Sequence, residues 1–255
     1  MRIAEIFYSI QGEGLLAGVP SIFIRTSGCN LRCHWCDTPY ASWKPEGPEM
    51  SVPEILRKIS AWNCRHVVLT GGEPMIAPDL PELAATLKKE GKHITIETAG
   101  TIAPNNISCD LASISPKLSN STPSSEQDRA WSKKHEAARL QPEVISDWIS
   151  NYAFQLKFVV SSELDLAEIK HLLSRLEIFN LSSEALAKEE APPLQRVRSE
   201  EGPLVPLHQI LLMPEGIDAQ TLSSRSPWLI EICKREGFRF CPRLHIDLFG
   251  HKRGT

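Results

Sequence analysis

Short apolar segments alternate with longer amphipathic segments along most of the chain. Six apolar segments, several of them rich in β-branched residues, have the length of buried strands, and they span residues 21–27, 66–70, 93–98, 111–115, 154–160 and 209–213. Helices are predicted by the amphipathic segments at 52–61, 79–90, 164–176 and 219–236. Ser51 and Glu54 have the spacing of a capping box at the start of the first of these helices.

This alternation of strands and helices predicts an α/β fold with a parallel sheet and right-handed crossovers. With six strands, we expect an open, partial (β/α)6 TIM-like barrel rather than a closed eight-stranded one. We predict a single domain over residues 1–255, interrupted by two surface insertions near 118–152 and 178–206. Because both insertions are rich in polar or charged residues, we expect a solvated helix in the first and a flexible loop in the second.

Charge and composition exclude several classes of protein. The chain has 28 basic and 31 acidic residues, a net charge of −3, so we expect neither a nucleic acid nor a membrane surface as partner. The N-terminus lacks the pattern of an export signal, and no apolar run is long enough to span a membrane. We therefore expect a cytoplasmic protein, whose 7 cysteines are ligands, nucleophiles or buried thiols rather than disulfides.

The strongest chemical signal is the sequence GCNLRCHWCDT at 28–38, called here the cysteine loop. Cys29, Cys33 and Cys36 form a C-x3-C-x2-C pattern directly after the first predicted parallel strand, at the sheet edge where α/β active sites form. Three thiolates so close together indicate a shared metal centre. An iron–sulfur cube held by three cysteines leaves one iron open to a substrate or cofactor. Zinc is the alternative, although a structural zinc site needs four ligands, usually in two separated pairs.

The pattern C-x3-C-x-aromatic-C, with Trp35 as the aromatic residue, resembles the signature of the radical S-adenosylmethionine (SAM) superfamily. GGEP at 71–74 and ETAG at 97–100 follow the next two strands, as in that superfamily. The resemblance implies a 4Fe–4S cluster whose open iron binds SAM, reductive formation of a 5′-deoxyadenosyl radical, and the partial barrel of the radical SAM type. The residues that it assigns to SAM are Trp35, Gly72, Glu73, Glu97, Ser115, Pro116, Lys117, Leu212, Met213, Pro214 and Glu215.

Within this superfamily, the chain resembles the 7-carboxy-7-deazaguanine synthase family from Glu5 to Thr255, apart from the two insertions. The similar segments include EIFYSIQGEG at 5–14, Asp37-Thr38 after the last cysteine of the loop, and the C-terminal PRLHIDLFGHKRGT. The resemblance implies a ring contraction of 6-carboxy-5,6,7,8-tetrahydropterin to 7-carboxy-7-deazaguanine with loss of ammonia, in the biosynthesis of queuosine and other deazapurines. It also implies a homodimer and an electron donor such as flavodoxin or ferredoxin.

The same resemblance implies a set of substrate contacts. The residues concerned are Ile10, Gln11, Gly12, Arg25, Thr70 and Thr255, the last through its terminal carboxylate. Arg25 would pair with the substrate carboxylate, for which a guanidinium is well shaped. Thr38 would bind Mg²⁺, a cation that usually keeps several waters and few protein ligands.

Three alternatives stay open from the sequence. A glycyl-radical-enzyme activase shares the C-x3-C-x2-C pattern but would act on a protein glycine. A zinc-stabilised interaction protein would use the same cysteines for structure alone. An inactive relative would bind the cluster without turnover, although all three cysteines and GGEP are present.

Overall fold

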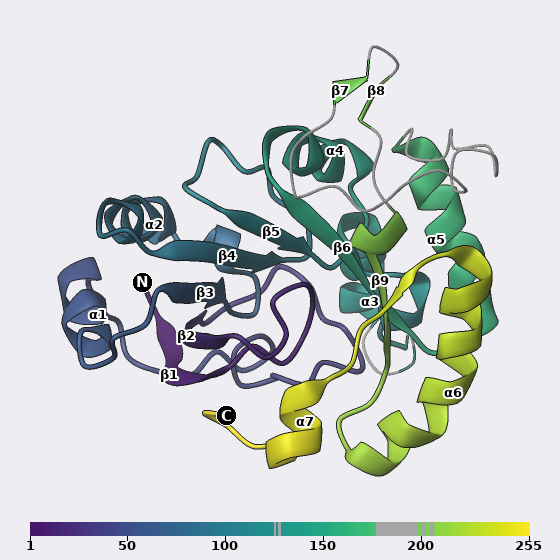
Figure 1. The fold of residues 1–255 in the computed structure, drawn as a ribbon, viewed down its shortest axis with the longest axis horizontal. Coiled ribbons are helices and arrows are strands. Elements are labelled where there is room, and N and C mark those ends of the chain that lie inside the picture. Colours follow the sequence, from purple (N-terminus) through teal and green to yellow (C-terminus); the bar gives the residue numbers. More distant parts are fainter. Residues whose placement is uncertain (125, 127–128, 177–197, 200–201, 204–206) are drawn as a thin grey trace.

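A mostly parallel sheet forms the centre of the protein (Figure 1). The computed structural model describes residues 1–124, 126, 129–176, 198–199, 202–203 and 207–255. In their order across the sheet, the strands are β1 (Ile3–Ile10), β2 (Pro20–Thr26), β3 (His66–Thr70), β4 (His93–Thr98), β5 (Leu111–Ile114), β6 (Phe154–Val160), β9 (Ile210–Pro214) and β10 (Arg239–Phe240). Strand β1 is antiparallel to β2, and every other neighbouring pair is parallel.

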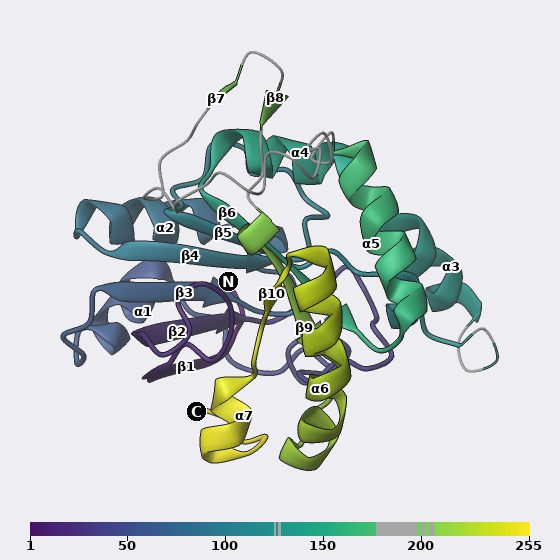
Figure 2. The same cartoon turned by 45° about the vertical axis from the view of Figure 1, so that its right-hand side comes forward.

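Helices cover the outer face of this sheet (Figures 1 and 2). The α-helices are α1 (Val52–Ile59), α2 (Leu80–Lys89), α3 (Arg129–Ala138), α4 (Pro142–Asn151), α5 (Glu163–Arg175), α6 (Ala219–Glu236) and α7 (Leu244–Phe249). Short 3₁₀ helices lie at Pro74–Ile76, Ser119–Ser121 and Leu207–Gln209. Helix α2 packs on β4, α4 on β5, α5 on β6 and α6 on β9, which is the arrangement of successive βα units.

The six predicted strands are confirmed as β2, β3, β4, β5, β6 and β9, and they form the parallel part of the sheet. The capping box is also confirmed, because the Glu54 side chain accepts hydrogen bonds from both the backbone and the hydroxyl of Ser51. In the described part of the chain the sheet is open, with β1 at one edge and β10 at the other. The sequence analysis did not list these two edge strands.

Strand alternation divides the sheet into two faces. One set of alternate side chains lies in the main hydrophobic core under the helices: Ile22, Ile24, Val67, Leu69, Ile94, Ile96, Leu156, Phe158, Ile210 and Leu212. The intervening positions, which include Arg25, Glu97 and Lys157, point to the opposite face and line a cavity. The fold therefore places polar groups inside the partial barrel, although the strands that carry them are almost wholly buried.

The segment 118–152 contains the expected solvated helix, α3, whose side chains are mostly exposed, but its second helix differs. Helix α4 buries Ile145 and Trp148 completely, and both belong to the main core against β5. Its core side chains alternate with exposed ones, as Ser146 and Asp147 between Ile145 and Trp148 show. Most of 178–206 lies outside the described residues, apart from the antiparallel pair β7 (Arg198–Ser199) and β8 (Gly202–Pro203). The division into one domain with two insertions stays a prediction.

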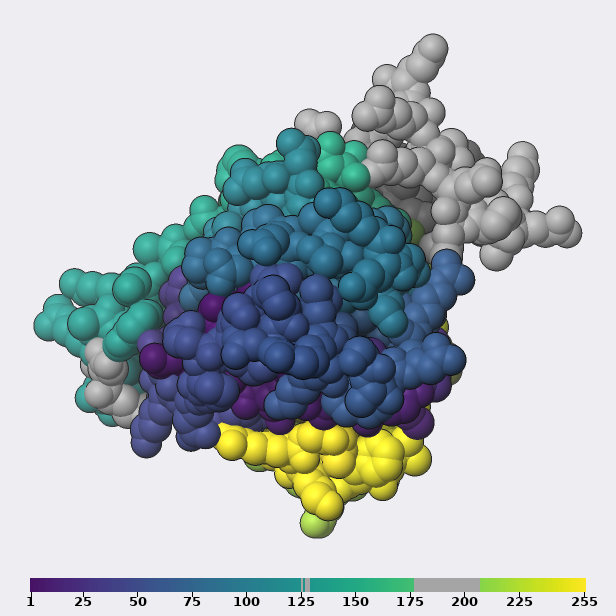
Figure 3. Space-filling model, turned by 90° about the vertical axis from the view of Figure 1, so that its left-hand side faces the viewer, coloured from purple at the N-terminus to yellow at the C-terminus, as the bar shows by residue number. Residues whose placement is uncertain are grey.

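None of the described helices is long and apolar enough to cross a membrane. Figure 3 shows the C-terminal segment (yellow) lying against the first part of the chain. The start of α7 contacts the N-terminal part of the chain, where the backbone N of Leu244 donates to the carbonyl of Gly12 at 2.9 Å.

The burial of Trp148 gives a stability prediction. Its ring is fully buried and its Nε1 donates to the carbonyl of Ile102 at 2.9 Å. We expect Trp148→Ala to lower the free energy of unfolding by about 3–5 kcal/mol, because it leaves a cavity and an unpaired carbonyl. Urea unfolding measures this change. The matched control is Trp43→Ala, at a ring that is 41% exposed, where we expect a change of about 0.5 kcal/mol. Equal losses in the two variants would contradict this assignment of the core.

Candidate functional site

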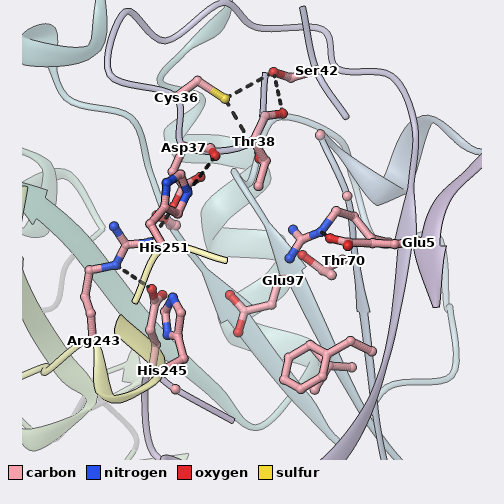
Figure 4. Close-up of a pocket in the computed structure, with 18 of the residues that line it drawn as sticks. Glu5, Cys36, Asp37, Thr38, Ser42, Thr70, Glu97, Arg243, His245 and His251 are labelled. Atoms are coloured by element: carbon pink, nitrogen blue, oxygen red, sulfur yellow. Dashed lines mark hydrogen bonds and ion pairs between the residues drawn. The ribbon is translucent and has the colours of Figure 1, made fainter. Parts of the chain in front are cut away.

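A cavity of about 470 Å³ opens at the carboxyl ends of the parallel strands. This is the edge at which ligands bind in α/β sheets and barrels. Arg25 reaches it from β2, Glu97 from β4 and Lys157 from β6, while the cysteine loop and the last residues of the chain complete its wall. Figure 4 shows Glu97 pointing into the cavity between Arg243 and His245 on one side and Glu5 and Thr70 on the other.

The structure brings most of the predicted site residues to this one cavity. Those that line it are Ile10, Gln11, Gly12, Arg25, Cys29, Cys33, Trp35, Cys36, Thr38, Thr70, Gly72, Glu97, Ser115, Lys117, Met213 and Thr255. They come from segments that are far apart in the sequence. Their convergence is an observation of the structure, whereas the role of each residue stays a proposal.

The cysteine loop offers three free thiols to the cavity. The Cys29 sulfur accepts a hydrogen bond from the backbone N of Leu31 at 3.3 Å, and the Cys36 sulfur lies 3.1 Å from Ser42 Oγ. Burial raises the pKa of Cys29 to about 11 and that of Cys33 to about 12. Thiols with such pKa values keep their protons at neutral pH until a metal replaces them, so cluster binding would release protons.

Three soft donors around one cavity fit an iron–sulfur cube with one open iron. Each cysteine of such a cube binds a different iron, so the sulfurs stand apart instead of surrounding one ion. In agreement, no group of three or more His, Cys, Asp or Glu side chains among the described residues is arranged around a single metal position. A structural zinc ion would need four ligands in that arrangement.

The GGEP turn packs directly on the cysteine loop. A Cβ atom on Gly72 would lie 2.3 Å from the carbonyl oxygen of Gly28 and 2.8 Å from the Cβ of Cys29, so only glycine fits. Gly72 lines the cavity, but Glu73 does not. The Glu73 carboxylate is fully buried and accepts hydrogen bonds from Thr98 Oγ1 and the backbone N of Ala99, both at 2.8 Å. Burial raises its pKa, and its side chain fixes the end of β4.

Four other residues predicted to contact SAM also lie outside the main cavity. Leu212 is turned to the opposite face of β9, into the core under the helices, as strand alternation requires. Pro116 is buried. Pro214 and Glu215 line a smaller adjoining pocket, which Trp35 and Arg243 share with the main cavity. Of the segment 212–215, only Met213 therefore faces the cavity.

A cation, Lys117, lies in the cavity wall next to the cysteines. Its Nζ donates to the carbonyl and the hydroxyl of Ser115, both at 2.8 Å, and lies 5.9 Å from the centre of the Trp35 ring. These contacts hold the ammonium beside the cysteine loop. The position suits the carboxylate of a bound amino acid.

Arg25 forms an ion pair with Glu5, a residue to which the sequence analysis gave no role. Its Nε donates to Glu5 Oε1 at 2.6 Å, and the same oxygen accepts from the hydroxyl of Tyr40 at 2.7 Å. Within the described part of the chain, the two terminal nitrogens of Arg25 have no hydrogen-bond partner. The guanidinium is therefore fixed in direction by Glu5, with a free edge available for a ligand carboxylate.

A buried ionic network, also not anticipated, crosses the base of the cavity. Glu13 lies 2.6 Å from Lys157 Nζ and 3.0 Å from Arg243 Nε. Lys157 also contacts Glu97 at 3.1 Å, and Arg243 contacts Asp37 at 2.5 Å. Although burial opposes its charge, Lys157 and Arg243 hold the pKa of Glu13 well below its usual range. Glu13 and Glu97 keep the pKa of Lys157 raised. One signal was present in the sequence: a lysine within the apolar strand FQLKFVV.

The N-terminal residues QGE and the C-terminal segment meet at this network. Gln11 Nε2 donates to Glu97 Oε1 at 3.4 Å. A Cβ on Gly12 would overlap the imidazole of His245, 2.0 Å from its Nδ1, so glycine allows this ring to pack on the backbone. Burial lowers the pKa of His245, which is therefore neutral at pH 7. Gly12 thus provides a packing surface for His245.

The last residues of the chain close one side of the cavity. The guanidinium of Arg253 stacks on Tyr40, 3.4 Å from the ring centre, and pairs with Glu46 at 3.1 Å. His251 Nε2 lies 3.1 Å from the carbonyl of Asp37. These contacts hold Thr255 at the cavity wall, where the sequence analysis expected it.

Comparisons with known proteins agree with the family that the sequence resembles. Residues 23–108 match the Radical SAM superfamily. The chain is 42% identical, over all of its length and 89% of the relative's, to 7-carboxy-7-deazaguanine synthase of Rhodopirellula baltica. It is 39% identical to the protein of the same name from Halobacterium salinarum, over 98% of this chain and 90% of that one. The crystal structure of QueE from Escherichia coli superposes with a TM-score of 0.64 at 25% identity, covering 96% of this chain and 94% of QueE.

The two sequence relatives and the QueE structure match nearly the whole chain, and the motifs that predicted this family from the sequence converge on a single cavity in the structure. The chain therefore belongs to the 7-carboxy-7-deazaguanine synthase family of the radical SAM superfamily.

Proposed function

We propose that this protein converts 6-carboxy-5,6,7,8-tetrahydropterin to 7-carboxy-7-deazaguanine, with loss of ammonia. One observation supports this most directly: a single cavity joins a three-cysteine loop to a polar wall that carries Arg25 and Glu97. The relatives with the same name support the same reaction, which makes the protein a ring-contracting carbon–nitrogen lyase in the biosynthesis of queuosine and other deazapurines.

The cysteine-loop side of the cavity is the proposed cofactor site. Cys29, Cys33 and Cys36 would hold a 4Fe–4S cluster, and SAM would bind between Trp35, Gly72, Ser115 and Lys117. When bound, these groups would supply the radical chemistry that removes a hydrogen atom from the substrate. The contribution of the chain is to hold these groups beside the substrate and to exclude water by packing Gly72 and Leu31 closely around the loop.

The opposite side of the cavity matches the chemistry of the substrate. The free edge of Arg25 can accept its carboxylate, and the Thr38 hydroxyl, also at the wall, is the proposed ligand of Mg²⁺. Glu97 and Gln11 provide an acceptor and an amide for the polar edge of the pterin ring. The parallel rings of Phe7 and Phe23, 4.9 Å apart, form an apolar part of the same wall.

Glu97 was assigned to SAM by the resemblance, but its surroundings favour the substrate. Its carboxylate contacts Gln11, Ser113 Oγ at 2.9 Å and Lys157, all at the base of the cavity. The residue beside it, Thr98, is instead bound to Glu73 under the GGEP turn. We therefore propose that Glu97 binds the pterin ring.

The remaining proposals follow from the family and the chemistry of the site. The cluster needs one electron for each activation, and a flavodoxin or ferredoxin is the proposed donor. A homodimer is the proposed assembly. The cytoplasm is the proposed location, since all 7 cysteines are free thiols and an iron–sulfur site needs a reducing compartment. A glycyl-radical-enzyme activase is not favoured, because the relatives over the full chain carry the name of the pterin enzyme.

The proposed reaction is tested by an anaerobic turnover assay on protein with a reconstituted cluster. The assay contains SAM, Mg²⁺, a reductant and 6-carboxytetrahydropterin, with detection of 7-carboxy-7-deazaguanine by mass. We expect product only when cluster, SAM, reductant and substrate are all present. Without Mg²⁺, we expect a smaller amount of product. Cleavage of SAM to 5′-deoxyadenosine without product would refute this substrate but would still support radical SAM chemistry. No product and no cleavage, from protein with a full cluster, would refute the proposal entirely.

The role of Arg25 gives a prediction for substrate binding. Arg25→Ala removes the charged partner of the substrate carboxylate, which is worth about 1.5–3 kcal/mol, so we expect KM to rise about 10- to 100-fold. Cluster content and SAM affinity should stay unchanged. The matched control is Arg239→Ala, at an exposed arginine of β10 that does not line the cavity. An unchanged KM in Arg25→Ala would remove Arg25 from the substrate site.

A further inference from the structure

The cysteine loop is fastened to residues that the sequence analysis assigned to a solvated insertion. Three N–H groups of the loop have their acceptors there. The backbone N of Arg32 donates to His135 Nδ1 at 3.1 Å, the backbone N of His34 to the carbonyl of Ser121 at 2.9 Å, and the indole of Trp35 to the carbonyl of Asn120 at 3.0 Å. Two of these three N–H groups lie between Cys33 and Cys36 in the sequence, and the third directly precedes Cys33.

His135 is the side chain at the centre of this contact. It is completely buried, on a helix whose other side chains are mostly exposed. Because its Nδ1 accepts the proton of Arg32 N–H, its own proton must be on Nε2, 2.9 Å from Ser121 Oγ. The Ser121 hydroxyl then donates to the carbonyl of Leu118 at 2.6 Å. Each hydrogen bond in this series from Arg32 to Leu118 has a defined direction. Only the neutral His135 ring, with a proton on Nε2 and none on Nδ1, permits this series.

Arg32 is held from its other side as well. Its Nη1 donates to the carbonyls of Cys29 at 3.1 Å and Leu31 at 2.8 Å, so the guanidinium closes the first half of the loop. The guanidinium also lies 4.1 Å from the ring centre of Trp131, one helical turn before His135. Helix α3 therefore contacts both the backbone and the side chain of Arg32, the last of the three residues between Cys29 and Cys33.

A loop that must present three thiols to one cluster gains from being shaped in advance, because binding then needs less ordering. The spacing of the cysteines fixes their order but not the conformation of the residues between them. In this structure, that conformation is set by hydrogen bonds to Asn120, Ser121 and His135.

We propose that His135 is a positioning residue that shapes the cysteine loop for cluster binding through the backbone N–H of Arg32. This inference rests on the proposed function only in assigning the cluster to Cys29, Cys33 and Cys36. It gives α3, which contributes little to the core, a part in forming the cluster site.

Three substitutions of His135 distinguish the effects of the two hydrogen bonds that its ring makes. In His135→Asn, the side-chain oxygen can take the place of Nδ1 and keep the acceptor for Arg32. In His135→Gln, the longer side chain can reach Ser121 but leaves Arg32 N–H without its acceptor. His135→Leu removes both contacts. The matched control is His171→Leu, at an exposed histidine of α5.

Two measurements test the effect of each substitution without depending on enzymatic turnover. The first is hydrogen–deuterium exchange of the Arg32 amide in protein before cluster reconstitution. The second is iron and sulfide content after reconstitution, with the rate of cluster loss in air and the electron paramagnetic resonance spectrum of the reduced cluster. Thermal unfolding of each variant reports its general stability.

We expect the Arg32 amide to exchange about tenfold faster in His135→Leu and His135→Gln, and the cluster to be lost several-fold faster, with an altered spectrum. His135→Asn should retain the behaviour of the natural protein in both readouts, as should His171→Leu. If His135→Leu does not fold, the proposal is tested by comparing His135→Asn with His135→Gln. Equal exchange and equal cluster stability in Asn and Gln would overturn the proposal, whether or not the pterin proves to be the substrate.

Discussion

The shape of the cavity depends on a set of buried charges that must be paired with one another. Glu13 lies between Lys157 and Arg243, which in turn contact Glu97 and Asp37. An unpaired charge at such a site costs several kcal/mol, so each of these groups fixes the position of its partners. Because they come from the N-terminal loop, two central strands, the cysteine loop and the C-terminal segment, their pairing holds five distant parts of the chain around one cavity.

The sequence predicted the parallel strands and the cysteine ligands because both are encoded locally. Short apolar segments specify strands, and three cysteines within eight residues specify a shared centre. It did not predict the partners of Arg25, Lys157 and His135, since each contact joins residues 20 or more positions apart. The inward direction of Met213 and the outward direction of Leu212 do follow from strand alternation, which the resemblance alone did not consider.

The same cavity accounts for two kinds of chemistry because its two sides are built differently. The cysteine loop and GGEP turn are close-packed, and burial raises the pKa of Cys29 and Cys33, so a bound metal must displace their protons. The opposite side is polar, with Arg25 and Glu97 held by fixed partners. The C-terminal residues join the two sides, since Arg243 pairs with Asp37 beside the last cysteine and Arg253 stacks on Tyr40 beside Arg25.

The claim that the buried network holds these segments together is tested most directly by a double-mutant cycle on Glu13 and Arg243. The measured quantity is the free energy of unfolding of the natural protein, Glu13→Gln, Arg243→Met and the double variant. Each single change should cost about 3–5 kcal/mol, because it leaves a buried charge without its partner. The double variant should cost at least about 2 kcal/mol less than the sum of the two. Additivity to within about 0.5 kcal/mol would show that the pair does not couple the two ends of the chain, and would contradict this account.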